Sequence, residues 1–167
     1  TLFGKNAGDS ITAGGYYNTA FGTSAAQDTT TGDRNTAIGS FALYRNVTGG
    51  ENTAIGAVSM GNNSGGTDGG SNTAVGAYSL YDITGGDRNV AVGVAAGENL
   101  TTGNDNIFIG NFAGNDTNGS KAVIIGNYAG DDNSPSNSVI IGYAAGRVIN
   151  GENTTAVGYN ALKVATE

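Results

Sequence analysis

The chain has 167 residues, enough for one ordinary domain, and its seven basic and 14 acidic residues give a net charge of −7. It contains no histidine and no cysteine, which excludes zinc sites, thiol chemistry and disulfides, and its acidity argues against nucleic acid as a partner. Thirty glycines, no tryptophan and an apolar fraction rich in alanine argue against long helices and against a thick globular core.

A short phrase recurs along the whole chain, and its clearest copies are NTAIG at residues 35–39 and 52–56. We call the glycine that closes each copy the anchor glycine. Successive anchors lie 16 to 20 residues apart: Gly4, Gly22, Gly39, Gly56, Gly76, Gly93, Gly110, Gly126, Gly142 and Gly158. The copies fill residues 1–167, which predicts a single repeat domain, and because both ends fall inside the repeat we expect a segment of something longer.

In chain order, each copy predicts a strand, then a second short strand or straight piece such as SFAL at residues 40–43, then a polar turn. The residue directly before the anchor is always β-branched or aromatic, as a half-buried pleated surface prefers. We call this set the apolar column: Phe21, Ile38, Ile55, Val75, Val92, Ile109, Ile125, Ile141 and Val157, preceded by Phe3. The residue three places after the anchor is always Ala or Ser, which indicates close packing there.

Two further columns indicate the register of the copies. A glycine usually lies seven places before the anchor among Thr, Asn and Asp, which predicts a turn with positive φ at that glycine. Six asparagines four places before the anchor predict a ladder whose amides bond along the stack. They are Asn18, Asn35, Asn52, Asn72, Asn89 and Asn106. The pairs Arg34 with Glu51 and Arg88 with Asp105, each 17 residues apart, predict weak ion pairs between neighbouring copies.

These patterns exclude a helical fold, because no 3.6-residue apolar stripe is present. They predict an all-β fold, a parallel β-solenoid or β-roll of about ten coils of 16 to 20 residues. Identical columns would lie ~4.8 Å apart, so nine rises give a rod of roughly 43 Å.

The strands of the later copies are apolar on both faces, as in IFIG at 107–110 and VIIG at 123–126 and 139–142. Such strands are buried on both faces, yet a thin coil can cover only one of them itself. The economical cover for the other face is a second copy of the chain, so we expect self-association. The alternative is a wider monomeric coil that encloses its own interior.

The phrases NTAIG, NTAVG, NSVIIGYAAG and NTTAVGYNAL resemble the repeats of YadA-like heads in trimeric autotransporter adhesins. They resemble at least as much the repeats of bacteriophage tail fibres and related host-recognition fibres, and the resemblance covers all ten copies. It implies a homotrimeric β-roll, intertwined or side by side, with apolar strands facing a threefold axis. Since the coils are longer than those of adhesin heads, a tail-fibre type is favoured. The resemblance further implies a virion, cell-surface or other extracellular location and a role in host attachment.

Residues that could support catalysis or metal binding are sparse. The acidic residues, such as Asp33 and Glu51, lie in turns and follow the repeat, so we expect a protein that is not an enzyme. A carboxylate pair could cut polysaccharide, but the lack of tryptophan argues against a sugar-binding cleft, which leaves a polysaccharide-binding or -degrading tail protein as an alternative. The turns at 114–119 and 130–137 offer calcium ligands but match no calcium-binding repeat, so no cofactor is predicted.

An outward column begins with Thr19, Thr36, Thr53 and Thr73, as in ice-binding solenoids, and this makes an ice-binding β-solenoid another alternative. The column then becomes aliphatic from Val90 onward, which suits an interface between chains better than an ice-binding face.

Recognition of a host-surface glycan or protein would be expected where the repeat is irregular or aromatic. The spacing of 20 across residues 60–72 predicts a Gly-rich loop that contains Asn62, Asn63 and Asp68, and insertions in repeats often form the binding face. Tyr44 and Tyr81 share one column, five places after the anchor. No apolar run approaches the ~20 residues that span a bilayer, so membrane insertion is not expected.

Overall fold

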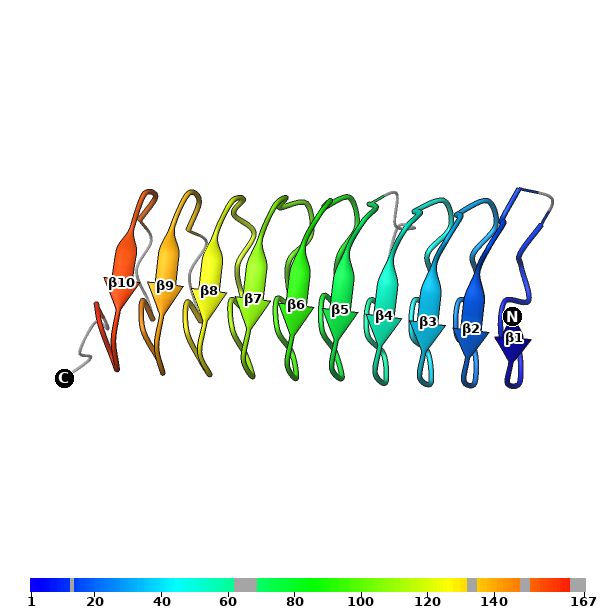
Figure 1. Ribbon diagram of the computed structural model, residues 1–167, viewed down its shortest axis with the longest axis horizontal. Helices are drawn as coiled ribbons and strands as arrows, with labels where there is room; N and C mark the ends of the chain where they lie inside the picture. The colour runs from blue at the N-terminus through cyan, green and yellow to red at the C-terminus, as the bar shows by residue number, and fades with distance from the viewer. Residues whose placement is uncertain (13, 62–68, 132–134, 148–150, 163–167) are drawn as a thin grey trace.

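The computed structural model describes residues 1–12, 14–61, 69–131, 135–147 and 151–162. In these residues ten short strands form one sheet in sequence order, and every neighbouring pair is parallel. The strands are β1 Leu2–Phe3, β2 Thr19–Phe21, β3 Thr36–Ile38, β4 Thr53–Ile55, β5 Thr73–Val75, β6 Val90–Val92, β7 Ile107–Ile109, β8 Val123–Ile125, β9 Val139–Ile141 and β10 Thr155–Val157. The predicted all-β parallel solenoid is confirmed, and Figure 1 shows its coils stacked into a rod with the strands aligned.

The strands pair in the register that the repeat predicts. In β3 and β4, Ala37 lies opposite Ala54 and Ile38 opposite Ile55. The register survives the longest spacing, because Ile55 of β4 lies opposite Val75 of β5. The additional residues of that coil are therefore accommodated between the strands.

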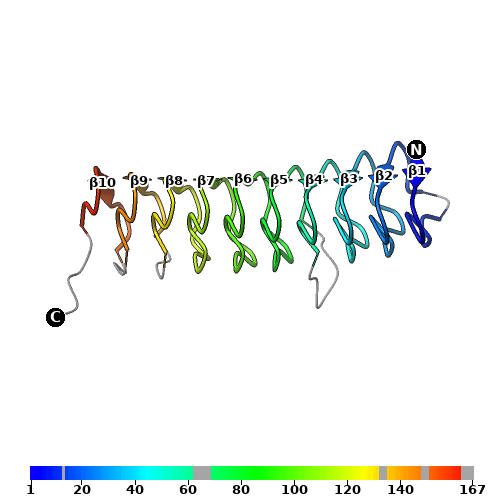
Figure 2. The ribbon, with the colours of Figure 1, turned by 90° about the horizontal axis from the view of Figure 1, so that it is seen from below.

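The core is lined by the middle residue of each strand. Strand geometry points successive side chains to opposite faces, and here the middle one points into the coil. These inward residues are all buried: Ala20, Ala37, Ala54, Ala74, Ala91, Phe108, Ile124, Ile140 and Ala156. Most of them are alanine, so the opposite walls of a coil approach closely and the core stays thin. In Figure 2 the strands run along one long side of the rod, and the remainder of each coil projects to the other side.

Large and small residues exchange places between the two halves of the core. From β3 to β5 the inward strand residue is alanine, and a large buried residue such as Leu43 or Leu80 lies four places after the anchor. From β7 to β9 the strand residue is large, and that other position is glycine. A Cβ on Gly97 would lie 2.6 Å from the Phe108 ring, and a Cβ on Gly114 would also lie 2.6 Å from it. Phe108 thus fills the volume that a leucine occupies in the earlier coils, and packing density is kept.

The second short strand expected at residues 40–43 is not a strand. Phe41 and Leu43 have φ values of 56° and 53°, so left-handed residues alternate with others along this segment. The Phe41 N–H donates to Thr23 O in the preceding coil, at 2.9 Å, and the Leu43 N–H donates to Ser59 O in the following coil, at 2.9 Å. The segment therefore bonds to both neighbouring coils without forming a β-ladder.

The conformational role of the glycines differs from the expectation. Positive φ belongs to the anchor glycines, as in Gly93 with φ +138°. A Cβ there would lie 2.4 Å from the carbonyl oxygen of Gly110, the next anchor. The turn glycine Gly86 does not have positive φ, so that prediction is wrong. It is required for close approach instead, because a Cβ on Gly86 would lie 2.4 Å from Gly103 O.

Candidate interaction surface

The apolar column lies on the outer face of the sheet, opposite the core. Ile38 and Ile109 are each 39 % exposed, and Phe21 and Val157 are more exposed still. Near the first strand, the rings of Phe3 and Phe21 stack with centroids 4.9 Å apart. Side chains of this size and polarity are normally buried, so the outer face carries an exposed apolar stripe along the length of the rod.

A second outward column runs parallel to the apolar column, three places before each anchor. It consists of Thr19, Thr36, Thr53, Thr73, Val90, Ile107, Val123, Val139 and Thr155. All of them are at least partly exposed, including the aliphatic Ile107 and Val139. We call the two outward columns together the strand face. Both faces of β7 to β9 are thus apolar as predicted, but only the inner one is covered by the chain itself.

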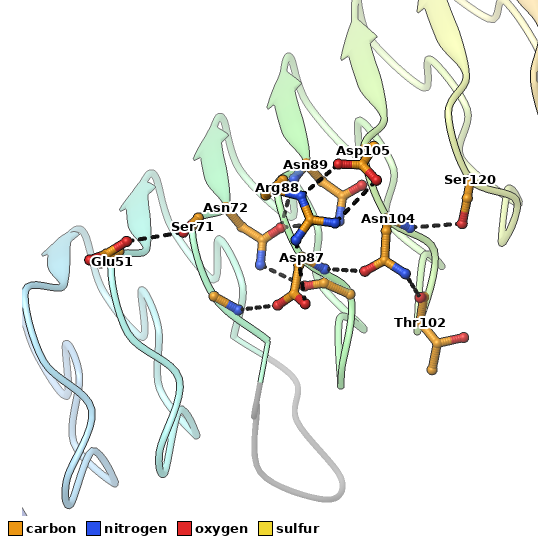
Figure 3. A network of polar contacts seen from close by, with 12 residues as sticks. Glu51, Ser71, Asn72, Asp87, Arg88, Asn89, Thr102, Asn104, Asp105 and Ser120 are labelled. Carbon is orange, nitrogen blue, oxygen red and sulfur yellow. Dashed lines mark hydrogen bonds and ion pairs between the residues drawn. The ribbon is translucent and has the colours of Figure 1, made fainter.

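The asparagine ladder lies behind the strand face and is fully formed. The Oδ1 atom of Asn72 accepts the backbone N–H of Asn89 at 2.9 Å, and the Oδ1 atom of Asn89 accepts that of Asn106 at 3.0 Å. The Nδ2 atom of Asn89 donates to Gly103 O, at 2.9 Å, in the turn of the following coil. Figure 3 shows Asn72 and Asn89 of this ladder. Each asparagine therefore fixes the coils on both sides of it, as the sequence predicts.

A second polar ladder, six places before the anchor, was not predicted. Asp87 accepts the Gly70 N–H at 2.8 Å, Asn104 accepts the Asp87 N–H at 2.7 Å, and Ser120 accepts the Asn104 N–H at 2.9 Å (Figure 3). Its members differ in residue type but share a short side chain with an oxygen acceptor. That shared property is the signal in the sequence that would have found the column.

The predicted ion pairs are present and exposed. Arg34 Nη1 lies 3.4 Å from Glu51 Oε1, and Arg88 binds Asp105 through Nε–Oδ1 at 2.6 Å and Nη2–Oδ2 at 3.1 Å. The hydrogen bond from Arg88 lowers the pKa of the Asp105 carboxyl, and the same bond raises the pKa of the Arg88 guanidinium. Exposed pairs of this kind contribute at most about 1 kcal/mol, so they adjust the register and are not the main source of stability.

Of the two turns considered for calcium, the one at 114–119 has polar residues that bond to the preceding coil, and residues 132–134 of the other lie outside the described residues. Asp116 accepts a hydrogen bond from the Nδ2 atom of Asn99, and Asn118 accepts the backbone N–H groups of Thr101 and Thr102 at 3.1 and 3.0 Å. Across the part of the chain that the structure describes, no group of three or more acidic residues is arranged to hold a metal ion.

The tyrosines considered for recognition are packed at the edge of the rod. Tyr44 is half-buried and contacts Phe41 edge-on with ring centroids 5.3 Å apart, and Tyr81 contacts Tyr78 in the same way at 5.5 Å. The structure therefore places each tyrosine ring against its neighbour in the same coil. Asn62, Asn63 and Asp68 lie outside the described residues.

The contribution of Glu98 to stability depends on pH. Burial raises the pKa of its carboxyl, and the negative charges of Asp82 and Asp116 in the neighbouring coils raise it further. The folded chain therefore holds this proton more tightly than the unfolded chain, so the contribution is favourable below the unfolded pKa of about 4.3 and is lost as pH rises through the folded pKa.

We predict that Glu98→Gln raises the melting temperature at pH 7 and has little effect at pH 3.5, where the wild-type side chain is protonated. Thermal unfolding of both proteins at the two pH values checks this. Glu152→Gln, at an exposed glutamate in another turn, controls for the general effect of removing one negative charge. A Glu98→Gln gain of equal size at both pH values would contradict the proton-linked cause.

Comparisons with protein-family models, with curated proteins and with solved structures found no match to this chain. Over the described residues, no helix is both long enough and apolar enough to cross a membrane.

Proposed function

We propose that this chain is a non-enzymatic structural segment of an extracellular fibre that assembles as a homotrimer. It would serve as a rigid shaft or head for host or surface attachment in a phage-like tail fibre or a bacterial surface adhesin. The observation that carries the proposal is the strand face, an exposed apolar stripe that extends from β2 to β10. A stripe of this length marks an interaction site in a soluble protein.

Rigidity along the axis supports a structural role. Each coil bonds to the next through backbone hydrogen bonds, and many of the coils are joined further by the asparagine ladder and by the second polar ladder. Bending the rod would strain all three sets together, because all of them run in the same direction. A segment built in this way holds whatever it carries at a fixed distance from its base.

Light scattering after gel filtration tests the assembly directly. We expect about three times the 16.5 kDa mass of the chain. A monomer at micromolar concentration would contradict the proposal and would mean that the strand face remains open to solvent.

A charge on the strand face separates assembly from folding. We predict that Ile109→Asp leaves the fold of each chain intact, because Ile109 is 39 % exposed and points away from the core. The variant should be monomeric in light scattering, since assembly would bury an unpaired carboxylate at a cost of several kcal/mol. Circular dichroism should show the same strand content as the wild type.

Thr102→Asp is the matched control, because it adds the same charge at an exposed turn residue on the other side of the coil. It should keep the wild-type mass. An unchanged mass for Ile109→Asp would remove the strand face from the interface.

Ice binding is the second candidate, favoured by the outward threonines of β2 to β5, which lie in register as Thr19, Thr36, Thr53 and Thr73. The column becomes aliphatic from β6, so the regular threonine face covers only part of the rod. A monomer that reshapes growing ice crystals would favour this candidate over the fibre.

A further inference from the structure

A second surface, uncharged except for Lys5, follows the strand face, directly after the bend at the anchor glycine. We call the residues one and two places after each anchor the corner. Its large side chains are exposed in several coils, with Phe41 40 % exposed and both Tyr78 and Val94 44 % exposed. Towards the C-terminal end, Tyr128 and Tyr143 continue it with ring centroids 6.0 Å apart. The rod therefore has two apolar surfaces that meet at an edge.

The corner residues have a backbone conformation that their side chains disfavour. Phe41, Val58, Tyr78, Phe112 and Tyr128 all have φ between 56° and 59°. An L-residue with a Cβ pays roughly 1–2 kcal/mol for a left-handed conformation, and a β-branched residue such as valine is an outlier there. Asn6 and Asn160 occupy the same position near the two ends, and asparagine adopts this conformation far more readily.

Contacts within the chain cover these bulky residues only in part, because Phe41 and Tyr78 contact rings of their own coil and still remain 40 % and 44 % exposed. Asparagine or glycine would relieve the strain, and a polar side chain would suit the exposure. Backbone strain that persists at a surface indicates that something else requires the side chain. A contact surface made by another molecule meets that requirement.

Charged residues are almost absent from the strand face and the corner. Of the seven basic and 14 acidic residues, only Lys5 lies within four positions of an anchor glycine. Every other charged residue in the sequence lies at least five positions from an anchor glycine. Interface cores are depleted of charge in this way, because a buried unpaired charge is costly.

The area supports the use of both surfaces. A three-residue strand is ~10 Å long, so over a rod of ~43 Å the strand face covers about 430 Å². If the strand face and the corner, which runs beside it for the same length, contact two different neighbours, each chain buries roughly 860 Å² in total over its two contacts, near the ~800 Å² per partner of a standard interface.

We propose that the strand face of one chain packs against the corner of the next copy, in a head-to-tail contact that closes into a ring. The inference rests on the proposed self-association and adds which surfaces meet. The partner at each surface is a second copy of the chain, because the side chains of both surfaces repeat at the same spacing, that of successive coils. A parallel copy, related by rotation about an axis along the rod, keeps every coil at the height of its equivalent. Two different surfaces that meet at an edge form a heterologous contact, and such contacts close into rings when the rotation permits.

Cysteine cross-linking tests this contact, because the chain has no cysteine of its own. Val90→Cys places a thiol on the strand face, and Val94→Cys places one on the corner of the same coil. Both substitutions are close in size to valine. We expect neither single variant to form disulfide-linked dimers on mild oxidation, whereas co-expressed chains that carry one cysteine each should do so. The double variant should give a covalent trimer on a non-reducing gel.

Light scattering of the same variants distinguishes the two levels of the proposal. One contrary result would be trimers in which each single variant forms disulfide-linked dimers by itself and the co-expressed pair forms no more of them. That result would overturn the head-to-tail contact and leave the fibre proposal in place. Trimers in which no combination links would do the same. Monomers for the cysteine variants and the wild type alike would overturn the fibre proposal itself. A ladder of bands beyond three chains would replace the closed ring with an open assembly.

Discussion

Gly93→Ala is expected to lower the free energy of unfolding by about 3 kcal/mol or more. Gly93 has φ +138°, a conformation that is essentially restricted to glycine, and a Cβ there would lie 2.4 Å from the carbonyl oxygen of Gly110. The obstructing atom belongs to the backbone of the next coil, so it cannot rotate away as a side chain could. Urea unfolding followed by circular dichroism measures the change.

Gly85→Ala provides a matched control in the preceding turn. Gly85 has no positive φ, and nothing lies within 4 Å of the position where a Cβ would be added. We expect a change within about 0.5 kcal/mol. Equal losses at the two positions would show that glycine is required generally for chain flexibility, and not specifically for the stacking of anchors.

Asn89→Ala is the second substitution with a large expected effect. It leaves the buried N–H of Asn106 without its acceptor and the carbonyl of Gly103 without the Nδ2 donor. Each buried polar group left unpaired costs about 1–3 kcal/mol, so the free energy of unfolding should fall by about 2–6 kcal/mol. Denaturant unfolding is again the measurement.

Asn118→Ala tests whether burial is the cause. Asn118 also accepts backbone N–H groups, those of Thr101 and Thr102, but it is exposed and water can replace it. Its loss should cost less than about 1 kcal/mol. If Asn118→Ala were as costly as Asn89→Ala, the number of hydrogen bonds and not their burial would determine the stability of the ladder.

The register of the coils could be predicted because it depends on residue types that recur in columns. Asn72 and Asn89 bond to the next coil in the way the repeat suggests, and the ion pair of Arg88 with Asp105 forms at the expected spacing. The sequence predicted positive φ at the turn glycines, but the anchor glycines have it instead. Most of the anchor glycines have no turn residue such as Asn or Asp beside them, whereas the turn glycines, which usually do have such neighbours, adopt ordinary φ values.

The conformation after the anchor could not be predicted from local preference. Phe41 and Leu43 are residues that favour strands or helices, yet both are left-handed, since only this geometry lets the segment bond to the coils on both sides. The core was equally hard to identify. Isoleucine in the apolar column is more hydrophobic than alanine, but in the coils of β3 and β4 the buried Leu43 and Met60 leave room only for small inward residues, Ala37 and Ala54. The larger side chains are therefore directed outward, where they form the strand face.

The exchange of volume between Gly97 and Phe108 affects how a rod of this kind can change its length in evolution. The coils from β3 to β5 share one packing scheme. Duplicating or deleting one of these coils therefore places coils with the same packing next to each other. Gly97 instead lies against both Leu80 and Phe108, where its Cβ would be 2.9 and 2.6 Å away, so the coils around β7 are interlocked. Recombination that separated them would create either a void or a clash. The junction between the two packing schemes must thus be inherited together, whereas coils that share one scheme can be added or lost one at a time.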